Sequence, residues 1–268
     1  MASFSSDGLD LAYDDIPAAG ERRGTVVLVH GFASNRTENW KRLGWYAALE
    51  RGGYRVVALD LRGHGESAKP HEAEAYDRAK LTADVIGLMD HAGLGPTHLM
   101  GYSMGAHLAL AIALGAPERV DRLVLGGIGG RMLGEGPPRP APKMSLSEAL
   151  LVEDPASITD PIQRGFRQFA QMQGDDRHAL AACAQGRGGG AVTREDLQGL
   201  SAPTLVVAGS RDDLAGNPQT LAEAIVGGKS VTLPGCDHFS AIPHALFKSA
   251  VFDFLEGWDE AEENFPDL

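Results

Sequence analysis

The strongest constraint on the fold of this chain is a repeated alternation between short apolar runs and longer amphipathic stretches. The amphipathic stretches 38–51 and 77–92 predict crossover helices between buried strands. The apolar runs are almost continuously apolar, which is typical of strands buried on both faces of a sheet. The alternation therefore predicts an α/β chain with a mostly parallel sheet and helices on both faces. The main runs occupy residues 25–29, 55–59, 97–100, 122–125 and 204–208.

Two weaker segments extend the predicted sheet at its ends. Residues 9–13 predict an antiparallel strand near the start of the chain, and residues 229–233 predict a last parallel strand. These segments lie before the first and after the last of the main runs. The sheet is therefore expected to use both ends of the chain.

The middle of the chain breaks the alternation, because residues 126–200 contain no strand-like run. An insertion of this length is too long for a structureless loop, so we expect an inserted helical lid. Two helical patterns support it, and the second carries Phe166, Phe169 and Met172 on one face. Packing of that face onto the body is favoured, with substrate contact as the alternative. The helical patterns lie at 146–152 and 161–172, and the expected core comprises residues 1–125 and 201–268.

Composition and charge exclude several classes of protein. The chain has 268 residues, of which 43% are hydrophobic, so it can bury a large core without disulfides. Its 36 acidic and 24 basic residues give a net charge of −12, without a basic stripe, which argues against nucleic-acid partners. Part of the acidic excess is a tail, which we interpret as a solvated segment rather than an interaction site. The tail acids are Glu256, Asp259, Glu260, Glu262, Glu263 and Asp267.

The cysteines and the start of the chain favour a cytoplasmic protein without a metal. The two cysteines, Cys183 and Cys236, make no Cys-x-x-Cys pair, and no metal-ligand spacing is present. The first fifteen residues lack a basic segment and an apolar core, so no signal peptide is expected. No apolar run approaches membrane-spanning length. We expect a monomer or homodimer that acts on a small molecule, without a membrane partner.

The sequence Gly101-Tyr102-Ser103-Met104-Gly105 is a G-x-S-x-G pattern between a predicted strand and a predicted helix. In that context it predicts a nucleophile elbow, a sharp turn that lifts the serine hydroxyl above the carboxyl edge of the sheet. The turn forces the serine into a sparsely populated backbone region. A Cβ at either glycine would crowd the neighbouring strand or helix. Ser103 is therefore the candidate nucleophile.

An acid and a histidine follow Ser103 in the order that such an elbow requires. A serine hydroxyl needs a base to remove its proton, and the base needs an orienting carboxylate. The last two predicted strands end near Asp212 and His238, which places both side chains at the same sheet edge. Asp212 is preferred over its neighbour Asp213. Asp237 is interpreted as a hydrogen-bonding group of the histidine loop.

The third requirement is an oxyanion hole. The backbone N–H of Met104 lies at a helix N-terminus, and the N–H of Phe32 lies in the loop after the first long parallel strand. His30 in that loop is interpreted as a hydrogen-bonding group that stiffens it. His98 and His107, in a predicted strand and a predicted helix, are interpreted as packed or capping groups.

These motifs together resemble the α/β-hydrolase superfamily, in its branch of small cofactor-free serine hydrolases. The resemblance rests on residues 30–32 (HGF), residues 60–67 (DLRGHGES), the Ser103 elbow, Asp212 and His238, which span nearly the whole chain. It implies an α/β-hydrolase fold with a mostly parallel eight-stranded sheet, helices on both faces, an inserted helical lid and no cofactor. Residues 62–67 are interpreted as scaffold. The implied roles are nucleophile, orienting acid, general base and two oxyanion donors for Ser103, Asp212, His238, Phe32 and Met104.

The resemblance implies a carboxylesterase-like serine hydrolase that cleaves esters or lactones through an acyl-enzyme. An elbow serine, in place of the aspartate of haloalkane dehalogenase and epoxide hydrolase relatives, disfavours those two chemistries. Three alternatives stay open: hydrolysis of C–C bonds, use of peroxide in place of water, and a ligand receptor that retains the fold. The expected substrate pocket is apolar, with Met132, Leu133 and Phe239 added to Phe32 and Met104.

Overall fold

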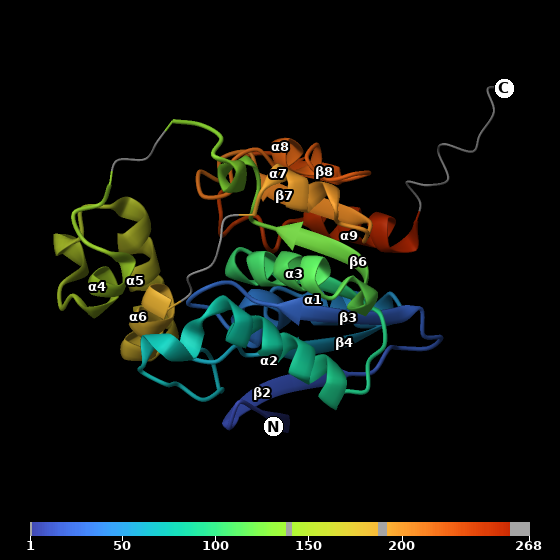
Figure 1. The fold of residues 1–268 in the computed structure, drawn as a ribbon, viewed down its shortest axis with the longest axis horizontal. Helices are drawn as coiled ribbons and strands as arrows, with labels where there is room; N and C mark the ends of the chain where they lie inside the picture. Colours follow the sequence, from blue (N-terminus) through green and yellow to red (C-terminus); the bar gives the residue numbers. More distant parts are fainter. Residues whose placement is uncertain (1, 138–140, 187–191, 258–268) are drawn as a thin grey trace.

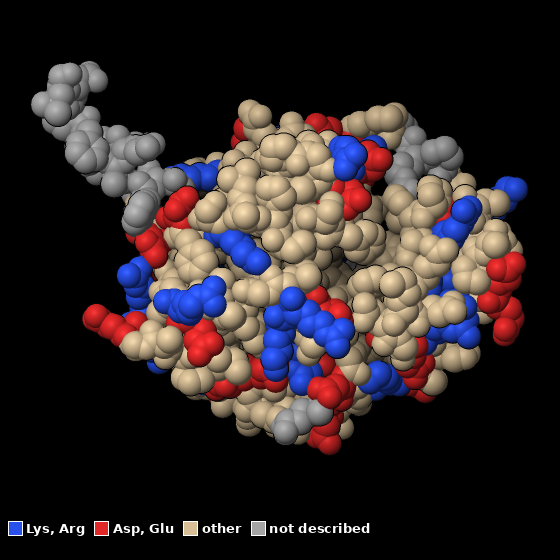
Figure 2. All heavy atoms as spheres, turned by 180° about the vertical axis from the view of Figure 1, so that it is seen from behind, with Lys and Arg blue, Asp and Glu red and all other residues tan. Residues whose placement is uncertain are grey.

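The computed structural model describes residues 2–137, 141–186 and 192–257. Five of the six tail acids lie outside these ranges, as do residues 187–191 of the expected lid. On the face shown in Figure 2, Lys and Arg are interleaved with Asp and Glu. None of the described helices is both long enough and apolar enough to cross a bilayer.

The sheet has eight strands in the order β1-β2-β4-β3-β5-β6-β7-β8. The pairs β1–β2 and β2–β4 are antiparallel, and all other neighbours are parallel. The eight-stranded, mostly parallel sheet is thus confirmed. The strands are β1 (Ala2–Ser6), β2 (Leu9–Ile16), β3 (Gly24–Val29), β4 (Tyr54–Leu59), β5 (Thr97–Tyr102), β6 (Val120–Gly126), β7 (Thr204–Gly209) and β8 (Lys229–Leu233).

Strand β1 is the one strand that the sequence analysis did not place. It forms a hairpin with β2 through the dipeptide Asp7-Gly8, whose residues have φ of 52° and 75°. Two consecutive positive φ values fit a type I′ turn, for which Asp-Gly is a strong sequence signal. The signal was present, but the polar residues of β1 do not form an apolar run.

Neighbouring residues of a strand point to opposite faces of the sheet, and apolar residues occupy both faces here, so helices cover both. Along β3, Val26 and Leu28 pack in the core that holds α1 and α9, whereas Val27 and Val29 pack with α2, α3 and α8. Figure 1 shows α2 and α3 lying together over one face. The core helices are α1 (Trp45–Arg51), α2 (Arg78–His91), α3 (Met104–Gly115), α8 (Pro218–Ala222) and α9 (Ala245–Glu256), with short turns η2 (Ala73–Tyr76) and η3 (Pro117–Arg119).

The predicted helix over 38–51 is wrong in one respect, because it is interrupted. A π-helical turn, η1 (Thr37–Lys41), precedes α1, and Gly44 between them has a left-handed φ of 78°. The break lets the buried rings of Trp40 and Trp45 meet edge to face, with centroids 6.0 Å apart. Packing of two large aromatic rings into one core therefore overrides helical continuity.

Between β6 and β7 the described residues form helices and no strand, as predicted. Figure 1 shows α4, α5 and α6 beyond the carboxyl end of β6, set apart from the sheet. The elements are η4 (Gly130–Leu133), α4 (Leu146–Leu151), η5 (Pro155–Ser157), α5 (Pro161–Gln173), α6 (Arg177–Gly186) and α7 (Arg194–Gln198). Helix α5 begins at an Asp160 cap followed by proline and ends at a left-handed Gly174, which explains its predictability. Helices α6 and α7 were not predicted.

Residues 60–67 make structural contacts, in line with their interpretation as scaffold. Arg62 is 1% exposed, and its guanidinium donates two hydrogen bonds of 2.7 Å to the carboxylate of Asp84, a fully buried residue of α2. The same guanidinium donates to the carbonyl of Ala75 at 2.8 Å. The Arg62–Asp84 ion pair therefore connects α2 to the turn after β4.

A buried carboxyl group, that of Asp175, lies in the insertion between α5 and α6. Asp175 Oδ2 is buried and has no hydrogen-bond partner among the described residues. Burial raises the pKa of Asp175 to about 7, and Lys69 opposes the shift. A carboxyl group in this environment prefers to be neutral.

Candidate active site

The elbow between β5 and α3 has the strained geometry that its sequence predicts. Ser103 has φ 52° and ψ −113°, outside the regions that non-glycine residues favour, and its N–H donates to Gly126 O at 2.8 Å. A Cβ on Gly101 would lie 2.2 Å from the Gly105 carbonyl oxygen, and one on Gly105 would lie 2.1 Å from that of Val29. Both glycines are therefore required for the close approach of helix and strand.

Three side chains from separate strand ends form one hydrogen-bonded row. His238 Nε2 lies 3.0 Å from Ser103 Oγ, and His238 Nδ1 lies 2.8 Å from Asp212 Oδ2. The other oxygen of Asp212, Oδ1, accepts the N–H groups of Leu214 at 3.1 Å and Ala215 at 3.0 Å. A carboxylate can only accept, so Nδ1 donates and Nε2 is left to accept the serine proton. The neighbouring Asp213 is exposed and lies outside this row.

The loop that carries His238 is fixed from two sides. The hydroxyl of Tyr102, next to the elbow serine, donates to the His238 carbonyl at 2.5 Å. Asp237 accepts the N–H groups of Phe239 and Ser240 and the hydroxyl of Ser240. The bonds from Ser240 hold the pKa of Asp237 below its usual value. Asp237 is thus the loop hydrogen-bonding group that the sequence predicted.

The two expected oxyanion donors come from different loops beside the serine. Met104 is the first residue of α3, so its N–H has no intrahelical acceptor. Phe32 lies in the loop after β3, where the N–H of Gly31 donates to Asn39 Oδ1 at 3.0 Å. Asn39 is 2% exposed, so this bond holds the loop from within the protein. Both residues line the cavity that contains Ser103.

His30 stabilises the same loop and is not placed to act as a base. Its Nδ1 lies 2.8 Å from Gly31 O, and its Nε2 lies 3.0 Å from the N–H of Leu61. The carbonyl fixes Nδ1 as donor and the amide fixes Nε2 as acceptor, so the ring is neutral. Complete burial lowers the pKa of His30 to about 4.

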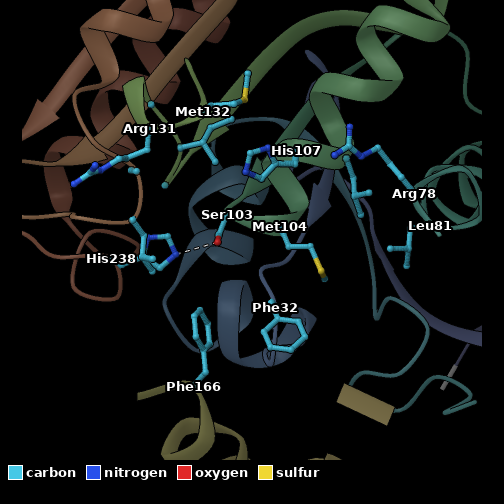
Figure 3. Close-up of a pocket in the computed structure, with 16 residues that line it drawn as sticks. Phe32, Arg78, Leu81, Ser103, Met104, His107, Arg131, Met132, Phe166 and His238 are labelled. Carbon is cyan, nitrogen blue, oxygen red and sulfur yellow. Dashed lines mark hydrogen bonds between the residues drawn. The ribbon is translucent and has the colours of Figure 1, made fainter. Parts of the chain in front are cut away.

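A cavity of about 460 Å³ opens over the serine and contains both Ser103 and His238. Figure 3 shows Phe32 and Phe166 on one side of the pair and Met132 on the other. Of the expected pocket residues, Phe32, Met104 and Met132 line this cavity. Phe239 lines a smaller cavity of about 30 Å³ that is also lined by Ser103 and His238. Leu133 lines neither of the two.

The large apolar side chains on one face of α5 lie in different surroundings. Phe166 lines both cavities, Phe169 lines the smaller one, and Met172 is 82% exposed. The rings of Phe166 and Phe32 meet edge to face with centroids 5.6 Å apart. Phe166 and Phe169 also pack against the core of the body, as the sequence analysis favoured, while their places in the cavities keep substrate contact as the alternative.

Three cavity residues were missed by sequence reasoning. His107, interpreted as a packed or capping group, is exposed and lines the larger cavity, so it is not packed in the core. Arg78 and Arg131 also line it. The one available signal was spacing, because His107 follows Ser103 by four residues and therefore lies on the same helix face. Among the described residues, no cluster of three or more His, Cys, Asp or Glu side chains could hold a metal ion.

Known proteins resemble the chain in sequence and in structure. A component of the acetoin-cleaving system of Pseudomonas putida, described as a dihydrolipoyllysine-residue acetyltransferase, is 34% identical over 82% of this chain, which spans 60% of that protein. A 2-hydroxy-6-oxononadienedioate/2-hydroxy-6-oxononatrienedioate hydrolase of Klebsiella pneumoniae is 29% identical over 88% of both chains. A hydrolase structure from Pseudomonas aeruginosa PA01 superposes with a TM-score of 0.72 at 26% identity, covering 95% of this chain and 97% of that one.

The fold and these likenesses define a protein of the α/β-hydrolase class. The family model described as the alpha/beta hydrolase fold matches residues 24–157, half of the chain. The protein belongs to the α/β-hydrolase fold family. The matched segment runs from β3 through the elbow and the start of the insertion.

Proposed function

We propose that this protein is a serine hydrolase that cleaves carboxylic esters or lactones through an acyl-enzyme on Ser103. The observation that carries the proposal is the hydrogen-bonded row from Ser103 through His238 to Asp212, with distances of 3.0 and 2.8 Å. Such a row activates a serine hydroxyl that is otherwise a poor nucleophile. The cavity above it has room for a small or medium substrate.

In the proposed reaction, Ser103 Oγ attacks the carbonyl carbon while His238 Nε2 takes its proton. The N–H groups of Met104 and Phe32 bind the oxyanion that forms. Collapse of the tetrahedral intermediate breaks the bond to the alcohol oxygen, which receives the proton from His238. Water then attacks the acyl-enzyme with His238 as base, and the acid leaves as Ser103 regains its proton. Asp212 stays ionised and holds the imidazolium in place.

The experiment that tests this proposal uses p-nitrophenyl esters with acyl chains from C2 to C12. Wild type and Ser103→Ala are compared, and intact mass is measured after treatment with a fluorophosphonate probe. Turnover by wild type with a single adduct that Ser103→Ala does not form is the expected result. Absence of labelling in folded wild type contradicts the proposal.

We further propose that residues 126–200 act as a lid over the site. Support comes from α5, which supplies Phe166 to both cavities beside Ser103. An aromatic side chain on a separate helical layer lets the layer exclude water when substrate is bound. Phe166→Ala is expected to shift the preferred acyl chain length in the ester series. An unchanged profile contradicts the lid role.

A second candidate is hydrolysis of a C–C bond by the same residues. It is favoured by the Klebsiella pneumoniae relative, which aligns along 88% of both chains. The compound in its name carries a ketone and two carboxylates but no ester, so its hydrolysis must break a carbon–carbon bond. Labelling of Ser103 without ester turnover, combined with cleavage of a vinylogous diketone, would favour this candidate.

A further inference from the structure

The charge of the larger cavity is opposite in sign to that of the protein. Two arginines, Arg78 and Arg131, and two histidines, His107 and the proposed base His238, line it, whereas none of its described lining residues is Asp or Glu. The whole chain carries 36 acidic against 24 basic residues. Charges of both signs are interleaved on the surface in Figure 2. A cavity that is lined by two arginines and no carboxylate, in an acidic protein, favours an anionic ligand.

Arg78 and His107 enter the cavity from two helices. His107 lies one turn along α3 from the nucleophile, since its N–H donates to Ser103 O at 3.1 Å. Four residues of α-helix rise by about 6 Å, which sets the scale of the separation along the helix. Arg78 is the first residue of α2, which packs against α3. Figure 3 shows both side chains on the opposite side of Ser103 from His238.

The guanidinium of Arg131 is held by backbone carbonyls of its own loop. Its guanidinium Nη1 donates to the carbonyls of Glu135 at 3.0 Å and Pro137 at 2.8 Å, which fixes it in the loop after η4. In Figure 3 its guanidinium points away from Ser103. Arg131 therefore adds positive potential at one rim, and Arg78 and His107 line the cavity across Ser103 from His238.

Besides Ser103 and the cationic side chains, apolar residues line the cavity. Leu81, Leu108, Ile128 and Met132 line the same cavity, so a hydrocarbon arm would lie among apolar side chains. A guanidinium presents paired N–H donors that match both oxygens of a carboxylate, and an imidazole adds a further donor. The site thus combines a reacting centre, an apolar span and a cationic end.

We propose that the substrate carries a carboxylate, joined by a short hydrocarbon arm to the scissile carbonyl or its leaving group and bound by Arg78 and His107. The inference rests on the proposed function, because it names the substrate class of the same site. It replaces the purely apolar pocket of the sequence analysis with one that is apolar along its length and cationic at one end.

The test compares two matched pairs of esters that differ only in charge. For the acyl arm, mono-p-nitrophenyl adipate is compared with its methyl ester; for the leaving group, the butyrate ester of 3-hydroxybenzoate is compared with that of methyl 3-hydroxybenzoate. Wild type is expected to prefer the anionic member of at least one pair by about 10- to 100-fold in kcat/KM, the value of a charge-assisted hydrogen bond. Equal kcat/KM within both pairs would overturn the inference and leave the serine hydrolase standing.

Variants assign the preference to residues. Arg78→Gln is expected to reduce it to within about threefold, Arg78→Lys to leave an intermediate value and His107→Gln to reduce it in part. The matched control is Arg51→Gln, an exposed arginine at the end of α1, which should retain the full preference. Because both esters are measured on the same variant, a loss of folded protein cancels from the ratio. An undiminished preference in Arg78→Gln would overturn the assignment.

A binding measurement separates this inference from the proposed function. Adipate is titrated calorimetrically into Ser103→Ala and into Ser103→Ala/Arg78→Gln. Binding to the first and at least tenfold weaker binding to the second supports the carboxylate subsite even where no ester is cleaved. Equal binding to both proteins, or binding to neither, contradicts it. Absence of ester turnover and of fluorophosphonate labelling contradicts the proposed function alone.

Discussion

Replacing Asp212 by asparagine provides the sharpest test of the proposed mechanism, because the structure fixes which way the new amide must face. One oxygen of Asp212 accepts two backbone N–H groups, from Leu214 and Ala215. An asparagine that kept those bonds would place its carbonyl oxygen there and turn its NH2 toward His238 Nδ1. The amide would then donate where the carboxylate accepts.

That reversal fixes the wrong tautomer of the histidine. With Nδ1 forced to accept, the proton of neutral His238 resides on Nε2, which faces Ser103 Oγ at 3.0 Å. The ring can no longer take the serine proton. Loss of the correct tautomer costs about 10⁴-fold in kcat, or about 5 kcal/mol of barrier, in serine hydrolases with this arrangement. Asp212→Asn is therefore expected to fall by about 10⁴-fold in kcat on an activated ester, with little change in KM.

The matched control is Asp213→Asn, which removes the same charge from an exposed neighbour outside the row. It should keep kcat within about twofold of wild type, since exposed substitutions away from special contacts have small effects. Circular dichroism and thermal melting check that both variants fold. Activity of Asp212→Asn within tenfold of wild type would refute the tautomer argument, and an equal loss in Asp213→Asn would assign the acid to the wrong residue.

Three further predictions concern the row, the scaffold and the insertion. Ser103→Ala and His238→Ala should each lower kcat on an activated ester by about 10³-fold or more. The double variant should lose no more activity than the worse single variant, because the two residues act as a unit. Additive losses in ester assays would argue against a shared step. Arg62→Met should lower the free energy of unfolding by about 3–5 kcal/mol, because it leaves the buried carboxylate of Asp84 without its cationic partner. In urea denaturation, Arg62→Met/Asp84→Leu should recover part of this loss. An unchanged free energy of unfolding in the single variant contradicts the scaffold role. The pKa of Asp175 is about 7 in the folded protein and near 3.9 when unfolded, so the unfolded chain loses its proton first and stability falls as pH rises between these values. Asp175→Asn should therefore raise Tm relative to wild type at pH 8 but not at pH 4, and a pH-independent difference would show that the carboxyl group does not titrate in this window.

Much of the fold could be predicted from local patterns. The strands that flank the elbow were found because burial on both faces demands continuous apolar runs, and α5 was found from its helical pattern, which places Phe166, Phe169 and Met172 on one face. The break at Gly44 could not be found in this way. It depends on Trp40 and Trp45 meeting in a core to which other parts of the chain contribute.

The chain by itself determined the elbow and the order of the residues that follow it, because steric demands at Gly101 and Gly105 and the ends of parallel strands are local features of sequence. Only the tertiary structure decided which side chains meet. It brought Asp212 rather than its exposed neighbour to the histidine, and it placed Arg78 and His107 in one cavity from two separate helices. The physical reason is that a contact between distant segments depends on how helices and sheet pack, and one residue of rotation or register changes which face a side chain occupies.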